Sequence, residues 1–271
     1  MQVNKQKFQV NFIQAGAGTP VILIHGLAAS LYDWEEITPA LTGASYATYA
    51  LDLLGHGKSG KPDQIKDYTI ANVFEHFSDW LDTLQLAEPP IFIGHSLGGY
   101  LALQYAQIHP QSVAALVLSD PFYTLSQLPF FLRINYRRPI LNTTIIERTP
   151  EWLFRRVIDL TSLSIRNGYT LPEAVRTQTA ADYKRAHPGI FNIIPSIQDF
   201  GPKLASILQP TLVLWGSRDQ TLSPASFSRV LHEMPNSSGG AIAGAGHVPH
   251  QSHPAEFNKR VLKFLQSLKN R

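Results

Sequence analysis

The pentapeptide Gly94-His95-Ser96-Leu97-Gly98 places a serine between two glycines, with a strand-like apolar run before it and a helical pattern after it. A sharp turn from strand into helix would expose the Ser96 hydroxyl, and small residues on either side would let the backbones pass without a Cβ clash. The N–H of Leu97 would face the same point and could stabilise an oxyanion. The pattern predicts a serine nucleophile, which we prefer to an accidental Gly-rich turn.

A serine hydroxyl is a poor nucleophile unless a base removes its proton. Among ten histidines, His247 follows the last strand-like run, at the sheet edge where Ser96 is expected. His250 and His253 follow at intervals of three, a spacing that could suggest metal ligands. Neighbouring prolines argue against a regular helix that presents all three on one face, and no carboxylate completes the set. We therefore expect a base at His247 and no metal or cofactor.

The base needs an acid that fixes its tautomer and stabilises its cation. Asp120 and Asp219 each follow a strand-like run, and the chain order Ser–Asp–His fits either. We favour Asp219, because its strand immediately precedes the one that leads to His247. A second oxyanion donor is expected from the N–H of Leu27, in the loop after another strand-like run.

The elements that must position these residues alternate along the chain. Short apolar runs without polar alternation predict strands buried on both faces. These runs cover residues 21–24, 47–51, 91–93, 115–118, 211–215 and, more weakly, 240–245, and residues 8–13 are a candidate edge strand. Helical patterns cover residues 70–86, 97–108, 227–232 and 257–268. The alternation indicates an α/β fold with a mostly parallel sheet, helices on both faces and ligands at the carboxyl ends of the strands.

One long segment, residues 121–208, breaks this rhythm, because it is rich in proline and has no convincing buried strand. It reads as helices and loops that pack a small core of their own, or as a lid over a cleft, and both descriptions can hold together. The predicted domains are a core of residues 1–120 and 209–271 and a helical cap of residues 121–208.

Aromatic side chains in this segment could line an apolar substrate pocket, although packing between helices explains them equally well. The candidates are Tyr123, Phe130, Phe131 and Trp152.

Composition excludes several classes of protein. The 271 residues contain no cysteine, which excludes disulfides, Cys-ligated metal sites and a thiol nucleophile. The net charge is +3, and the Lys and Arg residues are scattered along the sequence. This distribution does not indicate a nucleic-acid-binding face. No apolar signal-peptide core is visible, and no run approaches the ~18 apolar residues of a membrane span. We expect a cytoplasmic protein whose partner is a small-molecule substrate; the oligomeric state is left open.

The chain as a whole resembles the α/β-hydrolase superfamily, of the cap-bearing serine esterase and hydrolase type. The matching pieces span nearly the whole chain in family order: His25-Gly26, residues 52–59, the Ser96 turn, residues 216–219 and Gly246-His247. The resemblance implies the α/β-hydrolase fold, a cap inserted between the sixth and seventh strands, and a triad of Ser96, His247 and Asp219. It also implies that Asp52 and His56 shape a loop rather than react. One departure is Ser252, where many relatives carry glutamate.

The residues and the resemblance together predict a serine hydrolase, in first place a carboxylesterase that forms an acyl-enzyme at Ser96. Dehalogenases and epoxide hydrolases of the superfamily carry aspartate at the nucleophile position, so Ser96 argues against both. The same three residues serve hydrolases of carbon–carbon bonds, lactonases, amidases and perhydrolases. Some relatives are ligand receptors with little turnover. These alternatives are separable only by substrate.

Overall fold

The computed structural model describes residues 8–130, 133, 149–150, 152–153, 155–156 and 171–269. These residues form a seven-stranded sheet, in which the strands lie side by side in the order β1-β3-β2-β4-β5-β6-β7. The strands are β1 (Phe12–Ala15), β2 (Thr19–Ile24), β3 (Tyr46–Leu51), β4 (Ile91–His95), β5 (Ala115–Ser119), β6 (Thr211–Gly216) and β7 (Ser237–Ile242). All neighbours pair in parallel except β1, which runs antiparallel to β3 at the edge. The predicted fold class is confirmed.

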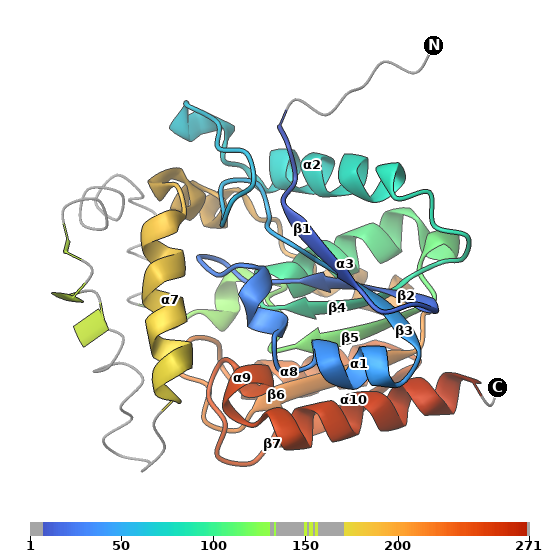
Figure 1. Ribbon diagram of the computed structural model, residues 1–271. Coiled ribbons are helices and arrows are strands. Elements are labelled where there is room, and N and C mark those ends of the chain that lie inside the picture. Colours follow the sequence, from blue (N-terminus) through green and yellow to red (C-terminus); the bar gives the residue numbers. More distant parts are fainter. Residues whose placement is uncertain are drawn as a thin grey trace.

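Helices cover both faces of the sheet. On one face lie α1 (Thr38–Gly43) and α10 (Pro254–Lys269), and on the other lie α2 (Ile70–Thr83) and α3 (Leu97–Ile108) (Figure 1). Successive residues of a strand point to opposite faces. In β2, Ile22 and Ile24 therefore join the core under α2 and α3, whereas Val21 and Leu23 join the core under α1 and α10. Burial on both faces explains the unbroken apolar runs in the sequence.

Two further helices, α8 (Ala225–Glu233) and α9 (Pro249–Ser252), follow β6 and β7. Short 3₁₀ helices fill the connections. They cover Leu31–Trp34, Ile65–Asp67, Pro110–Ser112, Leu125–Gln127, Pro188–Asn192, Ile194–Ser196 and Gly201–Ser206.

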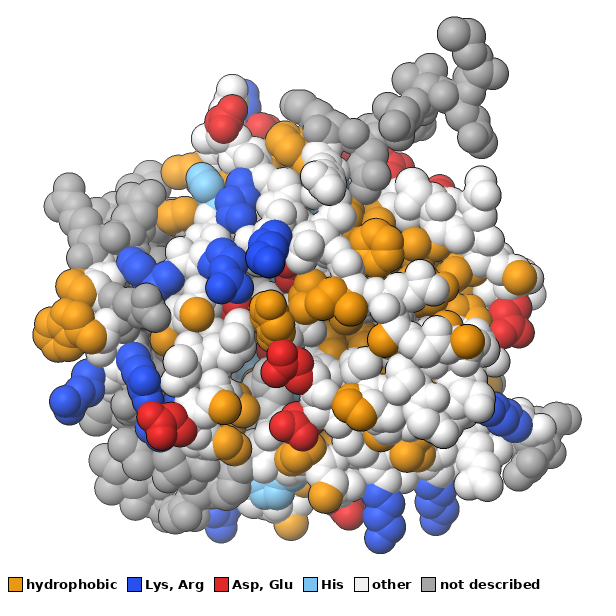
Figure 2. Space-filling model, viewed as in Figure 1, with side chains coloured by type: hydrophobic (Ala, Val, Ile, Leu, Met, Phe, Trp, Pro, Cys, Tyr) orange, Lys and Arg blue, Asp and Glu red, His pale blue; other side chains and the backbone are white. Residues whose placement is uncertain are grey.

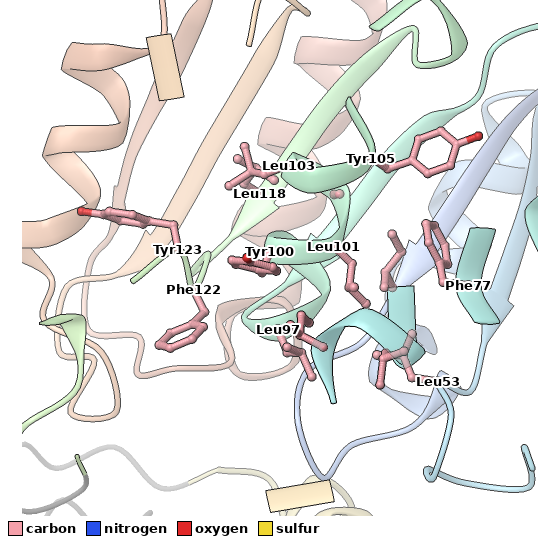
Figure 3. Close-up of a cluster of buried hydrophobic side chains, with 14 of the residues drawn as sticks. Leu53, Phe77, Leu97, Tyr100, Leu101, Leu103, Tyr105, Leu118, Phe122 and Tyr123 are labelled. Atoms are coloured by element: carbon pink, nitrogen blue, oxygen red, sulfur yellow. The ribbon is translucent and has the colours of Figure 1, made fainter. Parts of the chain in front are cut away.

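The core beneath α3 fixes the helix that directly follows the predicted nucleophile. Phe77 of α2 contacts the rings of Phe92 in β4 and Tyr105 in α3 edge to face, with centroids 5.8 and 5.9 Å apart. Leu97 and Leu101 of α3 lie in the same cluster (Figure 3). Aromatic packing of this kind adds to the hydrophobic free energy of burial. It holds the start of α3 at the carboxyl end of β4.

Segment 121–208 lies between β5 and β6 in the order of the described strands, whereas the resemblance counts its flanking strands as the sixth and seventh. Its longest described helix is α7 (Glu173–Arg185), which lies at the carboxyl-end side of the sheet (Figure 1). Phe131 lies outside the described residues.

The C-terminal edge strand differs from its prediction. The weak apolar run at 240–245 predicted a strand there, but β7 covers Ser237–Ile242, and a turn with Gly244 at φ +81° follows it. Most residues of this edge strand are partly or fully exposed, so polar Ser237 and Ser238 occupy positions that an apolar pattern does not find.

No helix of the described residues is long and apolar enough to cross a bilayer. On the face shown in Figure 2, Lys and Arg side chains are interspersed with acidic, polar and apolar ones.

Candidate active site

Ser96 lies in a strained turn between β4 and α3. Its backbone has φ +48° and ψ −110°, a conformation that residues with a side chain rarely adopt. Backbone hydrogen bonds hold the turn: the Ser96 N–H donates to the Ser119 carbonyl at 3.0 Å, and the Ser96 carbonyl accepts from the N–H of Phe122 at 3.0 Å. Strain held in this way by the surrounding structure is typical of functional sites.

Glycines on both sides of Ser96 are required by close backbone approaches. A Cβ at Gly98 would overlap the Ile24 carbonyl of β2, and a Cβ at Gly94 would lie 2.5 Å from the Gly98 carbonyl oxygen. Across the site, a Cβ at Gly26 would lie 2.8 Å from Nδ1 of His95 and 3.3 Å from Cβ of Ser96. The sequence pattern around Ser96 therefore has a steric cause at each glycine.

The structure brings Ser96, His247 and Asp219 into one chain of hydrogen bonds. His247 Nδ1 lies 2.7 Å from Asp219 Oδ2, and His247 Nε2 lies 3.1 Å from Ser96 Oγ. A carboxylate can only accept, so the imidazole proton lies on Nδ1 and Nε2 is left to accept from the serine hydroxyl. This is the tautomer in which a histidine can take a proton from serine.

Asp219 is held by the turn that follows β6. Its Oδ1 accepts from the N–H groups of Thr221 at 2.7 Å and Leu222 at 3.0 Å. Burial works against ionisation of Asp219, but the charge and hydrogen bond of His247 and these two amides outweigh it and hold its pKa below the usual value. Asp219 is thus a fixed anion behind the imidazole.

The second candidate acid, Asp120, lies beside Asp219 rather than against His247. Its backbone is also in the left-handed region, at φ +44°. Its Oδ1 accepts from the Gly216 N–H at 2.9 Å, and Oδ2 accepts from Ser119 Oγ at 3.2 Å. Burial, and then the charge of Asp219, raises the pKa of Asp120 well above its ordinary value. Two adjacent buried carboxyl groups cannot both ionise easily, so Asp120 is the neutral member of the pair and donates to Asp219.

The two predicted oxyanion donors flank the same cavity as Ser96. Leu97 is the first residue of α3, where backbone N–H groups have no acceptor within the helix. Leu27 lies in the loop after β2, which His25 stabilises. His25 Nε2 accepts from the Leu53 N–H at 3.0 Å, so its Nδ1 donates to the Gly26 carbonyl at 2.7 Å.

The cavity in front of Ser96 has a volume of about 160 Å³. Cavities of about 150 Å³ accommodate a benzene-sized molecule. Apolar side chains that line the cavity come from segment 121–208 and from the rest of the chain. They include Phe122, Leu128, Ile194 and Leu222.

Three predicted pocket residues do not line this cavity. Tyr123 is buried, and its hydroxyl donates to the Ser226 carbonyl at 3.0 Å. Its neighbour Phe122 takes the lining position instead, and the two side chains leave the backbone in different directions (Figure 3). Phe130 and Trp152 are about 70% solvent-exposed, at 71% and 68%. Aromatic content alone does not reveal which side of an irregular segment faces a cleft.

Helix α7 contributes polar groups that the sequence analysis did not single out. Gln178, Thr179 and Asp182 line the cavity opposite Ser96. Burial raises the pKa of Asp182 to about 7, and Gln178 Nε2 donates to its Oδ1 at 2.8 Å. The α7 side of the cavity is therefore polar, with a carboxyl group that titrates near neutral pH.

Asp52 and His56 organise a loop, as the resemblance implies. Asp52 accepts from the N–H groups of Leu31 and Lys58, both at 2.8 Å. His56 Nδ1 lies 2.9 Å from the Leu54 carbonyl, and burial lowers the pKa of His56 to about 3. Neither side chain lines the cavity. Ser252 is buried in α9, with its Oγ 3.0 Å from Nδ1 of His253.

Comparison with known proteins shows the family to which this chain belongs. A family model described as the alpha/beta hydrolase fold matches residues 19–254. The 2-hydroxy-6-oxo-6-(2'-aminophenyl)hexa-2,4-dienoic acid hydrolase of Metapseudomonas resinovorans is 28% identical, over 97% of this chain and 89% of the relative.

Solved structures agree on the fold. A bromoperoxidase from Bacillus anthracis superposes with a TM-score of 0.83 and 23% identity, over 97% of each chain. A thermophilic esterase from Thermogutta terrifontis gives a TM-score of 0.81 and 22% identity, over 96% of this chain and 94% of the other.

The glycine requirement in the turn leads to a first prediction. Gly98→Ala should destabilise the protein by about 1–3 kcal/mol, because the new methyl group overlaps the Ile24 carbonyl. Urea denaturation measures this change. Gly43→Ala is the matched control, since no atom lies within 4 Å of its added Cβ, and its stability should stay equal or rise. Equal stability of the two variants would contradict the close approach.

The neutral state of Asp120 leads to a second prediction. Asp120→Asn preserves the shape and a donor toward Asp219 but removes the ionisable group. A raised native pKa means that the unfolded state ionises first, so wild-type stability falls as pH rises above the ordinary aspartate value of 3.8. The variant should gain stability relative to wild type as the pH rises above 3.8, measured by urea denaturation. A difference that is independent of pH would show that Asp120 is not held neutral.

Proposed function

Because this chain belongs to the α/β-hydrolase fold family, we propose that it is a serine hydrolase that cleaves a carboxylic ester with an apolar group. The observation that carries the proposal is the continuous chain of hydrogen bonds from Asp219 through His247 to Ser96. Its polarity matches what an acyl-transfer enzyme needs, with an anion, an imidazole that can accept, and a hydroxyl that can donate. The apolar side of the cavity supports an apolar acyl or alcohol group.

In the proposed first step, His247 Nε2 takes the proton of Ser96 while Oγ attacks the ester carbonyl carbon. The carbonyl oxygen becomes an oxyanion that accepts from the N–H groups of Leu27 and Leu97. Collapse of this intermediate breaks the bond to the alcohol, which leaves with the proton from His247. Asp219 stabilises the imidazolium that exists between these events.

Water completes the cycle. His247 removes a proton from water, whose oxygen attacks the acyl-enzyme carbonyl. The Ser96 oxygen then leaves with that proton, and the carboxylic acid is released. The chemistry is complete with this chain's own residues and water.

We also propose that residues 121–208 act as a cap over residues 1–120 and 209–271. Support comes from α7, whose Gln178, Thr179 and Asp182 line the cavity across from Ser96. The cap would select substrates through both the polar groups of α7 and the apolar side chains of Phe122, Leu128 and Ile194.

A carbon–carbon bond hydrolase is the second candidate, because the 28%-identical relative is named as a hydrolase of a dienoic acid. Lactonase, amidase and perhydrolase activities use the same three residues. A slow ligand receptor is a further alternative outside turnover enzymes. A panel of p-nitrophenyl esters, lactones and vinylogous diketones separates these classes.

The nucleophile proposal predicts fast turnover of at least one p-nitrophenyl ester and a loss of about 10³–10⁶-fold in kcat for Ser96→Ala. Ser126→Ala, a serine in a 3₁₀ helix away from the cavity lining, is the control and should keep its activity. Unchanged kcat in Ser96→Ala would reject Ser96 as the nucleophile. Turnover confined to diketones would favour the second candidate, and tight binding without turnover would favour a receptor.

The choice of acid gives a separate prediction. Asp219→Asn removes the acceptor that fixes the His247 tautomer and should lower kcat by about 10⁴-fold. Asp120→Asn replaces a neutral carboxyl group with a neutral amide and should lower kcat by less than about tenfold. Steady-state kinetics on the same ester compare them. The reverse order of losses would transfer the role of acid to Asp120.

A further inference from the structure

Beside Ser96 lies a buried group that the proposed hydrolysis does not use, formed by Asp33, His95 and His250. Asp33 lies in the 3₁₀ helix Leu31–Trp34, His95 ends β4, and His250 lies in α9. All three side chains are at least nine-tenths buried. Asp33 Oδ2 lies 3.5 Å from His95 Nδ1 and 3.9 Å from His250 Nε2, and the three atoms lie within 4.8 Å of one another.

Each of these three atoms is buried without a hydrogen-bond partner among the described residues. Buried polar atoms are seldom left in this state, because losing water without a replacement costs about 1–3 kcal/mol or more per group. Here three such atoms, from three distant parts of the chain, converge on one point.

The other polar atom of each side chain is already engaged. His95 Nε2 lies 2.9 Å from the His247 carbonyl, and Asp33 Oδ1 accepts from Gln251 Nε2 at 2.9 Å. A carbonyl only accepts, so the proton of neutral His95 lies on Nε2 and its Nδ1 presents a lone pair.

His250 follows the same logic. Its Nδ1 lies 3.4 Å from Ser119 Oγ, whose hydroxyl proton is donated to Asp120. In the tautomer whose Nδ1 proton is donated to Ser119, His250 Nε2 presents a lone pair. All three converging atoms then present a lone pair. The space between them would therefore favour a positively charged ion.

A proton shared between a histidine and Asp33 does not fit the distances between these atoms. A charged histidine and a carboxylate that share a proton lie about 2.7–2.9 Å apart, closer than either contact here. Two ligands of one zinc ion, each about 2.1 Å from the metal in tetrahedral geometry, lie about 3.4 Å apart. The 3.5 Å contact fits this spacing, and the 3.9 Å contact needs only a wider angle at the metal.

We propose that Asp33, His95 and His250 bind one divalent transition-metal ion, with Zn²⁺ the ion best suited to two imidazoles and a carboxylate. The outer contacts are those of such sites, where a ligating histidine donates its second N–H to a carbonyl and a ligating carboxylate accepts a further hydrogen bond. Asp33, His95 and Gln251 also border the cavity, from which a solvent molecule can supply a fourth ligand.

The ion would reach the proposed active site through His95. The His95 ring lies between the proposed metal position and the His247 carbonyl. In the chain, His95 directly precedes Ser96. The ion would thus tie the loop of the proposed base to the strand that carries the proposed nucleophile. The site itself does not depend on the hydrolase proposal.

The test measures metal content rather than activity. Protein purified without a polyhistidine tag is stripped with EDTA, incubated with Zn²⁺ or Co²⁺ and desalted, and the metal is counted by mass spectrometry. Wild type should retain about one ion per chain, whereas Asp33→Asn and His250→Gln should bind at least about tenfold more weakly. His253→Gln, which removes the neighbouring histidine of the same segment, should retain the ion.

Two further readouts keep the test independent of folding defects. Bound Co²⁺ should give the visible absorption of a four-coordinate nitrogen and oxygen site in wild type and in His253→Gln. Zn²⁺ should raise the melting temperature of these two proteins and not of folded Asp33→Asn, checked by circular dichroism.

Failure of wild type to retain either ion above the level of Asp33→Asn would overturn the proposal. So would loss of the ion in His253→Gln with retention in Asp33→Asn, because the metal would then be on the surface. A doubly protonated His95 ring in ¹⁵N NMR of the untreated protein would show that a proton occupies the place instead.

Discussion

The backbone strain at Ser96 is the constraint on which the rest of this site depends. A φ of +48° at a residue with a side chain persists only where the surroundings fix it, and here β5, the loop after β5 and α3 do so through backbone hydrogen bonds. Close packing demands glycine at positions 94 and 98, and the aromatic core of α2 and α3 keeps the helix against the sheet. The turn presents the hydroxyl and the first amide of α3 to the same cavity.

The ionisation of the buried groups around this turn is also fixed by their neighbours. Asp219 and Asp120 are adjacent and buried, yet their pKa values shift in opposite directions. At Asp219, His247 and two amides outweigh burial and lower the pKa, whereas at Asp120 burial and the charge of Asp219 outweigh its hydrogen bonds and raise the pKa. The anion fixes the imidazole tautomer, which leaves Nε2 free to accept from Ser96. A second arrangement of buried polar groups, Asp33, His95 and His250, lies beside this site, and His95 contacts the His247 carbonyl.

Much of this could be predicted from the sequence, for a geometric reason. Carboxyl ends of parallel strands meet at one edge, so Ser96, Asp219 and His247 were expected together from the strands that precede them. Choosing between Asp120 and Asp219 was also possible, because strand order decided which carboxylate faces His247.

Pocket residues were not predictable, because the direction of Phe122 or Tyr123 depends on an irregular segment without a period. The buried Asp33 group was hidden for another reason. Its members come from a 3₁₀ helix, a strand end and a short helix, and only packing brings them together. The spacing of His247, His250 and His253 could suggest metal ligands, but neighbouring prolines argue against such a cluster. In the fold, His247 contacts Ser96 and His250 lies near Asp33.

The strained turn is proposed to aim Ser96 at a point shared by His247 and the N–H groups of Leu27 and Leu97. A crystal structure of the protein after reaction with an alkyl phosphonate ester tests it most directly. The account predicts phosphorus bonded to Ser96 Oγ, with a phosphoryl oxygen about 3 Å from the N–H groups of both Leu27 and Leu97. Attachment to another residue, or a phosphoryl oxygen turned away from both amides, would contradict it.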